Sequence, residues 1–200
     1  MPRLFVAIDL PSAVRERLSP LCSGLPGARW ITPENYHLTL RFCGDIDLST
    51  AESLAESLAD IARPSFELRL AGLTAFGNAK PRAVVARVEP NRALSELQAQ
   101  HERIAQRVGL APESRKYTPH VTLARLRNAR PRAVADYLAT RGGFESESIP
   151  IDRFVLFSAR DQVGGGPYVV ENVYPLARPP AAAPAAAQIN EEEPPPWSSN

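Results

Sequence analysis

The pattern of apolar and polar positions predicts an alternation of strands and helices along most of the chain. Short apolar runs and strict alternation are typical of strands, whereas apolar residues three and four positions apart are typical of amphipathic helices. Strands are predicted at 3–10, 29–31, 37–42, 66–73, 83–88, 120–126, 144–149, 153–159 and 168–174. Helices are predicted at 12–21, 48–62, 92–108 and 131–141.

Two of the predicted strands begin with the same tetrapeptide pattern. His37-Leu38-Thr39-Leu40 is matched by His120-Val121-Thr122-Leu123, 83 positions later (120 − 37 = 83), and the chain contains only three histidines. Successive side chains of a strand point to opposite faces, so each histidine shares a face with the threonine two residues on. Each motif strand therefore directs one imidazole and one hydroxyl to the same side.

Each half of the chain contains strands, helices and one of these motifs, which predicts internal pseudo-symmetry. The expected fold class is α+β, with two pseudo-symmetric lobes, each a mostly antiparallel sheet with outer helices, facing each other across a central cleft. We expect one domain over residues 1–177. Residues 178–200 are rich in Pro, Ala and Glu and lack the apolar content to fold, which predicts a disordered tail.

Composition says little about which partners the protein binds. The net charge is +1, from 23 basic and 22 acidic residues, so no global field favours a nucleic acid or an anionic membrane, and any such contact would be local. Cys22 and Cys43 have no metal-ligand spacing, and free thiols are expected. No segment is typical of a signal peptide or a membrane span, so we expect a cytoplasmic monomer with no membrane partner.

The residues of the paired motif suit phosphoester chemistry. Imidazole titrates near neutrality, so one ring can accept a proton while the other donates one. Two hydroxyls nearby can hydrogen-bond the oxygens of a phosphoryl group. A zinc site is the alternative, but no Cys or carboxylate lies within two residues of either histidine, so we expect neither a metal nor another cofactor. His101, in the middle of a predicted helix, is interpreted as a solvated residue.

The two motifs, extended to Arg41-Phe42-Cys43-Gly44 and to Pro119 through Arg125, resemble the signatures of the two-histidine (2H) phosphoesterase superfamily. Residues 3–11 and 154–158 most resemble its bacterial and archaeal RNA 2′,3′-cyclic phosphodiesterases, also called 2′-5′ RNA ligases. The resemblance implies metal-independent hydrolysis of 2′,3′-cyclic phosphate at RNA ends, or of small cyclic nucleotides, to a 2′-phosphate. It also implies a weak, reversible ligation that forms 2′-5′ linkages.

The resemblance also implies a role for individual residues. His37 would be the proton donor and His120 the proton acceptor, Thr39 and Thr122 would bind the phosphate, and Arg125 would lie near the phosphate or base. It further implies base stacking for Phe42. Strict alternation disagrees at the last two positions, because it predicts that Phe42 and Arg125 face away from the histidines unless the strand bulges near Ala124.

Basic residues with nearby aromatic residues could form a local rim for an RNA backbone. The candidates for this rim are Arg41, Arg115, Lys116, Tyr117 and Arg125. Two other functions remain possible for the same residues. One is a non-catalytic nucleotide- or RNA-binding module that uses the same cleft, and the other is a metal-dependent hydrolase.

Overall fold

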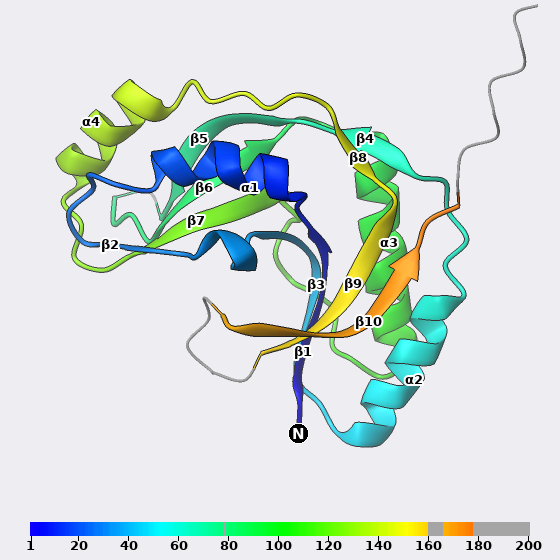
Figure 1. Cartoon of the computed structure of the whole chain (residues 1–200). Coiled ribbons are helices and arrows are strands. Elements are labelled where there is room, and N and C mark those ends of the chain that lie inside the picture. Colours follow the sequence, from blue (N-terminus) through cyan, green and yellow to red (C-terminus); the bar gives the residue numbers. More distant parts are fainter. Residues whose placement is uncertain (78, 160–165, 178–200) are drawn as a thin grey trace, which may run out of the picture.

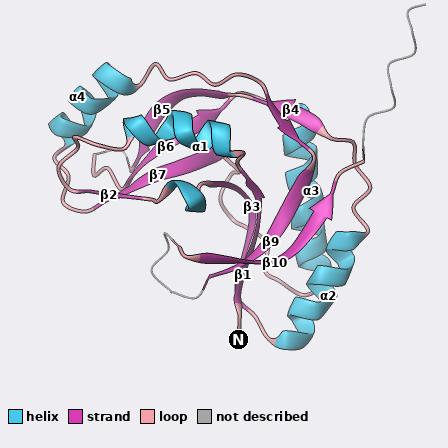
Figure 2. Cartoon of the chain, in the orientation of Figure 1, coloured by secondary structure: helices cyan, strands magenta, loops and turns pink. Residues whose placement is uncertain are grey.

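The structure, a computed structural model, describes residues 1–77, 79–159 and 166–177 (Figures 1 and 2). The predicted tail at 178–200 and the glycine-rich segment 160–165 lie outside the described residues. The strands are β1 (Arg3–Asp9), β2 (Ala28–Trp30), β3 (His37–Asp45), β4 (Phe66–Leu68), β5 (Leu70–Phe76), β6 (Ala83–Val88), β7 (His120–Leu126), β8 (Ile149–Ile151), β9 (Arg153–Ala159) and β10 (Tyr168–Pro175). The helices are α1 (Ser12–Leu18), α2 (Leu48–Ala59), α3 (Arg92–Arg107) and α4 (Pro131–Arg141), with short 3₁₀ turns at Ser19–Leu21 and Pro33–Asn35.

The main sheet has the strand order β10-β9-β1-β3-β7-β6-β5, and β2 also pairs with β7. On either side of the β3–β7 junction lie β1 and β9 in one lobe and β6 and β5 in the other. Counted outward from the junction, the third strand is β9 in one lobe and β5 in the other. Each comes from the half of the chain that does not contain the motif strand of its lobe. This order confirms the α+β fold class with two pseudo-symmetric, mostly antiparallel lobes. The sheets of the lobes are not separate, however, because they are continuous through one antiparallel pair, Leu38 with Val121.

The helices cover the two lobes on the outside. In Figure 1, α2 and α3 lie against the lobe of β1, β3, β9 and β10, and α1 and α4 lie over the lobe of β5, β6 and β7. One large apolar cluster lies between the helices and the sheet and extends through both lobes, from Leu4 and Leu38 to Val121 and Val134. Among the described residues, no helix is long and apolar enough to cross a membrane.

Two of the predicted strands have different bounds in the structure. The alternation over 66–73 predicts one strand, but the ladder changes partner at Arg69, because β4 pairs with β8 whereas β5 pairs with β6. The strand predicted at 144–149 is wrong except for Ile149, which begins β8. Both differences arise from pairing with distant segments, which a local pattern does not specify.

The prediction of a solvated His101 is wrong. Its side chain is only 1% exposed and lies in the apolar stripe of α3 between Leu97 and Ile104. The ring contacts Phe154 edge-on, with centroids 4.6 Å apart, and its Nδ1–H donates to the carbonyl of Leu97 at 2.8 Å. Burial lowers the pKa of His101 to about 4, so it is a neutral core residue at neutral pH.

Candidate active site in the central cleft

The junction of β3 and β7 brings the two His-x-Thr-Leu motifs together. Leu38 and Val121 form the only ladder pair between these strands in the part of the chain that the structure describes, and both side chains are fully buried. In an antiparallel ladder, residues at equal distances on either side of a pair face each other. His37 therefore lies across from Thr122, and Thr39 lies across from His120.

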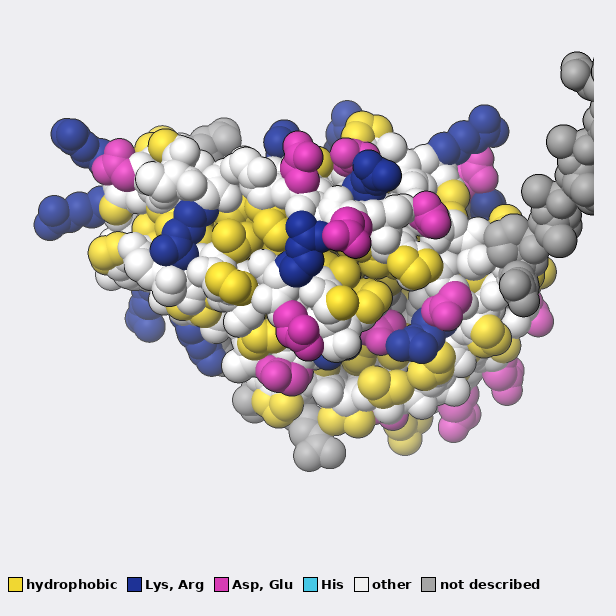
Figure 3. Space-filling view, turned by 45° about the horizontal axis from the view of Figure 1, so that its top comes forward, with side chains coloured by type: hydrophobic (Ala, Val, Ile, Leu, Met, Phe, Trp, Pro, Cys, Tyr) yellow, Lys and Arg dark blue, Asp and Glu magenta, His cyan; other side chains and the backbone are white. Residues whose placement is uncertain are grey.

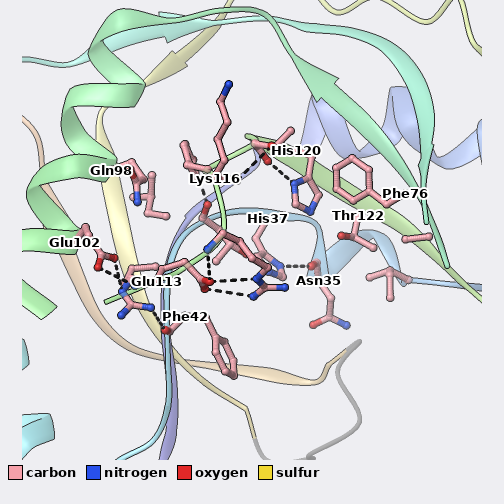
Figure 4. Close-up of a pocket in the computed structure, with 18 of the residues that line it drawn as sticks. Asn35, His37, Phe42, Phe76, Gln98, Glu102, Glu113, Lys116, His120 and Thr122 are labelled. Carbon is pink, nitrogen blue, oxygen red and sulfur yellow. Dashed lines mark hydrogen bonds and ion pairs between the residues drawn. The ribbon is translucent and has the colours of Figure 1, made fainter. Parts of the chain in front are cut away.

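This register places the two imidazoles on one diagonal of a four-residue array and the two hydroxyls on the other. Directly opposite Cβ atoms are about 5 Å apart and diagonal residues about 7–8 Å apart. A group the size of a phosphate can therefore contact all four side chains. In Figure 4, His37 and His120 lie close together in the cleft, with Thr122 and Phe76 on one side and Gln98 and Glu102 on the other.

The two rings are held in the same way. Nδ1 of His37 is 2.8 Å from the carbonyl oxygen of Asn35, and Nδ1 of His120 is 2.7 Å from that of Thr118, in each case the residue two positions earlier. A carbonyl oxygen can only accept, so Nδ1 of each ring carries a hydrogen. Nε2 is then the atom left for chemistry, as an acceptor in the neutral ring and as a donor in the charged one.

Aromatic side chains surround both rings. His37 lies against Phe5, with centroids 4.9 Å apart, and meets Tyr168 edge-on at 5.1 Å. Phe76 of β5 contacts His120 edge-on at 4.7 Å. These contacts restrict rotation of the imidazoles and exclude water from their flanks, so the two Nε2 atoms have a defined direction.

Burial lowers the pKa of both histidines below the usual 6.5. For His37, burial is the main cause, and the charges of His120 and Arg125 act in the same direction, while the hydrogen bond to Asn35 opposes them. For His120, burial is again the main cause, with Arg125 adding to it and the bond to Thr118 opposing it. In the empty cleft both rings are therefore mainly neutral at pH 7.

A β-bulge in β3 decides which way Phe42 points. The register with β1 skips one residue of β3 between Thr39 and Arg41, so Leu40 and Arg41 both lie on the buried side. Phe42 then returns to the face of Thr39, where it lines the cleft and is 46% exposed. The core position that strict alternation predicts for Phe42 is wrong.

β7 has a bulge at the equivalent position. Its register with β6 skips Leu123, so Leu123 and Ala124 are both buried and Arg125 returns to the face of Thr122. Arg125 is exposed and lines the cleft. Phe42 and Arg125 each follow their histidine by five residues (42 − 37 = 5; 125 − 120 = 5), so the repeat supplies an aromatic ring from one lobe and a cation from the other.

The cleft has a volume of about 740 Å³ and contains all six residues that the sequence singles out. Those residues are His37, Thr39, Phe42, His120, Thr122 and Arg125. The additional rim residues also line it, namely Arg41, Arg115, Lys116 and Tyr117. Within the described ranges, no group of three or more His, Cys, Asp and Glu side chains is arranged as a metal site.

Arg41 is the exception among the predicted rim residues. It is buried, with 8% of its surface exposed, and its Nε lies 2.7 Å from Oε2 of Glu102 on α3. The guanidinium also donates to the carbonyls of Phe42 and Ala111. Arg41 lines the cleft, but its guanidinium is held by these partners, so it is not the solvated rim residue that the sequence predicts.

The ion pair of Arg41 and Glu102 fixes the loop that leads into the second motif. The other carboxylate oxygen of Glu102 accepts from the backbone N–H of Glu113 at 3.0 Å. Further along this loop, the hydroxyl of Tyr117 donates to the carbonyl of Thr39 at 3.2 Å. The loop ends at Thr118, whose carbonyl holds His120, so the two motifs are connected by contacts as well as by the sheet.

Sequence reasoning missed several residues that build the site. Asn35 and Thr118 act through their backbone carbonyls, for which side-chain identity gives no signal. Glu102 and Phe76 come from α3 and β5, and only tertiary pairing brings them to the cleft. The one available signal was in β7, where Leu123 and Ala124 are consecutive apolar residues, whereas 37–42 alternates strictly and gives no sign of its bulge.

The chain matches one protein family twice. The family described as LigT like Phosphoesterase matches residues 8–86 and again residues 85–168, one match for each half. A protein of Aeropyrum pernix named RNA 2′,3′-cyclic phosphodiesterase is 35% identical over 132 residues, which are 64% of this chain and 74% of that protein. A Thermotoga maritima protein of the same name is 29% identical over 164 residues, 78% of this chain and 86% of its own length.

Other relatives match over different shares of their length. A Geobacillus stearothermophilus protein with the same name is 34% identical, but the matched part spans only 41% of it and 60% of this chain. Among solved structures, Escherichia coli LigT complexed with 3′-AMP has a TM-score of 0.72 and 27% identity, covering 89% of this chain and 100% of that chain. A Thermus thermophilus protein has the same TM-score at 24% identity, which shows the shared fold alone.

Replacing Glu102 by Leu should destabilise the protein strongly, because it leaves the buried Arg41 charge without its partner. The expected loss is about 3–5 kcal/mol in the free energy of unfolding, measured by urea denaturation. Glu96→Leu on the same helix is the matched control, since its ion pairs with Arg63 and Arg92 are more exposed and its loss of stability should be much smaller. Equal small losses in both variants would contradict this account.

Proposed function

The chain belongs to the family of LigT-like phosphoesterases, and from this premise we propose that it hydrolyses 2′,3′-cyclic phosphate at RNA or nucleotide ends to a 2′-phosphate. The observation that carries the proposal is the four-residue array at the β3–β7 junction. Two imidazoles that each expose Nε2 lie on one diagonal, and two threonine hydroxyls lie on the other. This arrangement matches an in-line displacement at phosphorus, in which the attacking and the departing oxygen are on opposite sides.

The reaction needs one neutral and one protonated ring. A neutral Nε2 accepts a proton from water as the water oxygen bonds to phosphorus, and the bond from phosphorus to the 3′-oxygen breaks. The protonated Nε2 of the other ring donates its hydrogen to that departing oxygen. The product is a 2′-phosphate, and the protonation states of the two rings are exchanged. General base and general acid each contribute typically about 10²–10⁴-fold to the rate.

The remaining cleft residues bind the substrate in this proposal. Thr39 and Thr122 donate hydroxyl hydrogen bonds to the phosphoryl oxygens that do not react. Arg125 stabilises the negative charge that builds up on those oxygens. Phe42 offers an exposed ring face to a nucleobase, and stacking of this kind is worth about 1–3 kcal/mol per base.

The anion of the substrate favours uptake of the missing proton from solvent. The pKa of each histidine is lowered in the protein alone, so a protonated ring is disfavoured there. A bound phosphate places a negative charge beside both rings and favours the charged form of one of them. The resemblance assigns the proton to His37. The deeper burial of His37 argues for His120 instead, so the assignment of acid and base needs its own test.

The same chemistry would ligate RNA if a 5′-hydroxyl took the place of water. Its oxygen would attack the cyclic phosphate, the 3′-oxygen would leave, and a 2′-5′ linkage would result. Nothing in the array distinguishes water from a sugar hydroxyl, and the same two rings would transfer the protons. Hydrolysis dominates in this proposal because water is far more concentrated than any RNA end.

The purified protein should hydrolyse a nucleoside 2′,3′-cyclic phosphate in excess EDTA, with the 2′-phosphate as the product by ³¹P NMR. His37→Ala and His120→Ala should each lower kcat by about 10²–10⁴-fold, because each removes one proton-transfer group. His101→Gln is the control, since the third histidine lies in the core away from the cleft, and its kcat should stay within about twofold of wild type at pH 8. Near-normal turnover in both cleft variants would disprove the proposal, and loss of activity on chelation would favour a metal-dependent hydrolase.

The pH dependence should identify the acid. Because the free-enzyme pKa of the acid is lowered, kcat/KM should already fall as pH rises through values below 6.5. In the complex the phosphate raises this pKa, so the alkaline limb of kcat should lie at higher pH. The variant that lacks the acid should lose its alkaline limb, and the variant that lacks the base should lose its acidic limb. Arg125→Gln should move the alkaline limb of kcat/KM upward, since Arg125 lowers the pKa of both rings; an unmoved limb would contradict this.

A further inference from the structure

Four strands present one row of residues on the cleft side of the β5–β6–β7 lobe. Phe76 pairs with Ala83, Ala83 pairs with Arg125, and Arg125 pairs with Arg29 of β2. Directly paired residues of a sheet share a face. Phe76, Ala83 and Arg125 line the cleft, so Arg29 extends the same row beyond it by one strand.

The neighbours of Arg29 along β2 confirm the direction of its side chain. Trp30 packs against Tyr137 of α4, with centroids 5.8 Å apart, on the outer side of the sheet. Ile31 lies on the opposite side and lines the cleft. Because side chains alternate along a strand, Arg29 shares the face of Ile31 and is exposed there.

Arg29 and Arg125 form a pair of like charges without a carboxylate between them. Among the described residues, neither takes part in an ion pair or a side-chain hydrogen bond. The two carboxylates that line the cleft are already paired at its other end, Glu102 with Arg41 and Glu113 with Arg115. Like charges directly opposite each other destabilise a sheet, so this pair costs free energy unless an anion lies between them.

Charge is distributed unevenly over the molecule. Residues 120–141 of the β7–α4 segment contain five arginines and one acidic residue, whereas residues 45–60 around α2 contain five acidic residues and no Lys or Arg. On the face in Figure 3, Asp and Glu side chains gather at the lower right, and Lys and Arg side chains project from the left end and from the upper right. An anionic strand that leaves the cleft is therefore attracted toward the β2–β7 side.

We propose that Arg29, beside Arg125, binds the phosphodiester that precedes the terminal nucleotide of an RNA strand, while Arg125 faces the reacting phosphate. This inference rests on the proposed function of the cleft. A 2′,3′-cyclic phosphate exists only at a 3′ end, so the strand leaves the histidines in the 5′ direction, and its nearest phosphate is one nucleotide away.

This subsite makes the enzyme prefer an RNA end over a mononucleotide. Arginine suits the position because its planar guanidinium offers several donors to phosphate oxygens. The contact lies away from the reacting atoms, so it contributes equally to the bound substrate and to the transition state. Loss of Arg29 should therefore raise KM for RNA and leave kcat unchanged.

The test uses two dinucleotides that both end in a 2′-phosphate, one with an ordinary phosphodiester and one with an uncharged methylphosphonate linkage. Calorimetry should show that the wild-type protein binds the phosphodiester about tenfold more tightly, which is the usual effect of one charged hydrogen-bonded contact. Arg29→Gln should bind the two with equal affinity. Its affinity for the methylphosphonate compound should equal that of wild type.

Arg103→Gln is the matched control, because it removes the same charge from an exposed position on α3 outside the cleft. It should keep the tenfold preference. This result would show that the contact of Arg29 with the phosphodiester, and not the net charge of the protein, causes the preference. A wild-type protein without the preference, or an Arg29→Gln protein that retains it, would overturn the proposal. The assay measures binding to product-like ends and does not depend on turnover. If the proposed hydrolysis fails, a cyclic phosphate will not be turned over, but the binding preference will remain.

Discussion

The pairing of Leu38 with Val121 is the constraint on which the rest of the structure depends. It is the single ladder pair that joins the two lobes among the described residues, and both side chains are buried in the shared core. Because it is antiparallel, it places each histidine opposite the threonine of the other motif. An array of two imidazoles and two hydroxyls follows from this register, and a slip by one residue would turn the histidine and threonine of one strand to the face opposite those of the other.

The second constraint is the bulge that follows each threonine. Without it, Phe42 and Arg125 would point into the core, and the cleft would lose one exposed aromatic ring and the cation beside the motifs. The bulge in β3 also turns Arg41 into the protein, where Glu102 neutralises it and together they fix the loop before His120. The same bulge thus occurs in both motif strands, but the residue that it turns to the cleft is Phe42 in β3 and Arg125 in β7. The two lobes therefore contribute different side chains to one site.

Most of the elements could be predicted from the sequence, because period-two and helical patterns are local, and the repeated tetrapeptide indicated that the two motifs share a site. Their direct pairing within one sheet could not be predicted, because strand pairing depends on distant segments. The directions of Phe42, Arg41 and Arg125 could not, since a bulge depends on how a neighbouring strand pairs and leaves only a brief break in the alternation. His101 was misjudged for a related reason. Its polar side chain satisfies Nδ1 within α3, at the carbonyl of Leu97, so it can occupy a core position that composition assigns to apolar residues. The position of Arg29 could not be predicted either, because it depends on the pairing of β2 with β7.

The proposed chemistry requires that both cleft histidines keep hydrogen on Nδ1 and present Nε2 to one phosphate. ¹⁵N NMR of the three imidazoles, with and without a nucleoside 2′-phosphate, measures both properties. We expect the Nδ1–H tautomer for neutral His37 and His120. When the ligand binds, both Nε2 resonances should shift, and the pKa of at least one of the two rings should rise. His101 should not respond. If His37 and His120 had the opposite tautomer, or if only one of them responded to the phosphate, the shared two-histidine site would be contradicted.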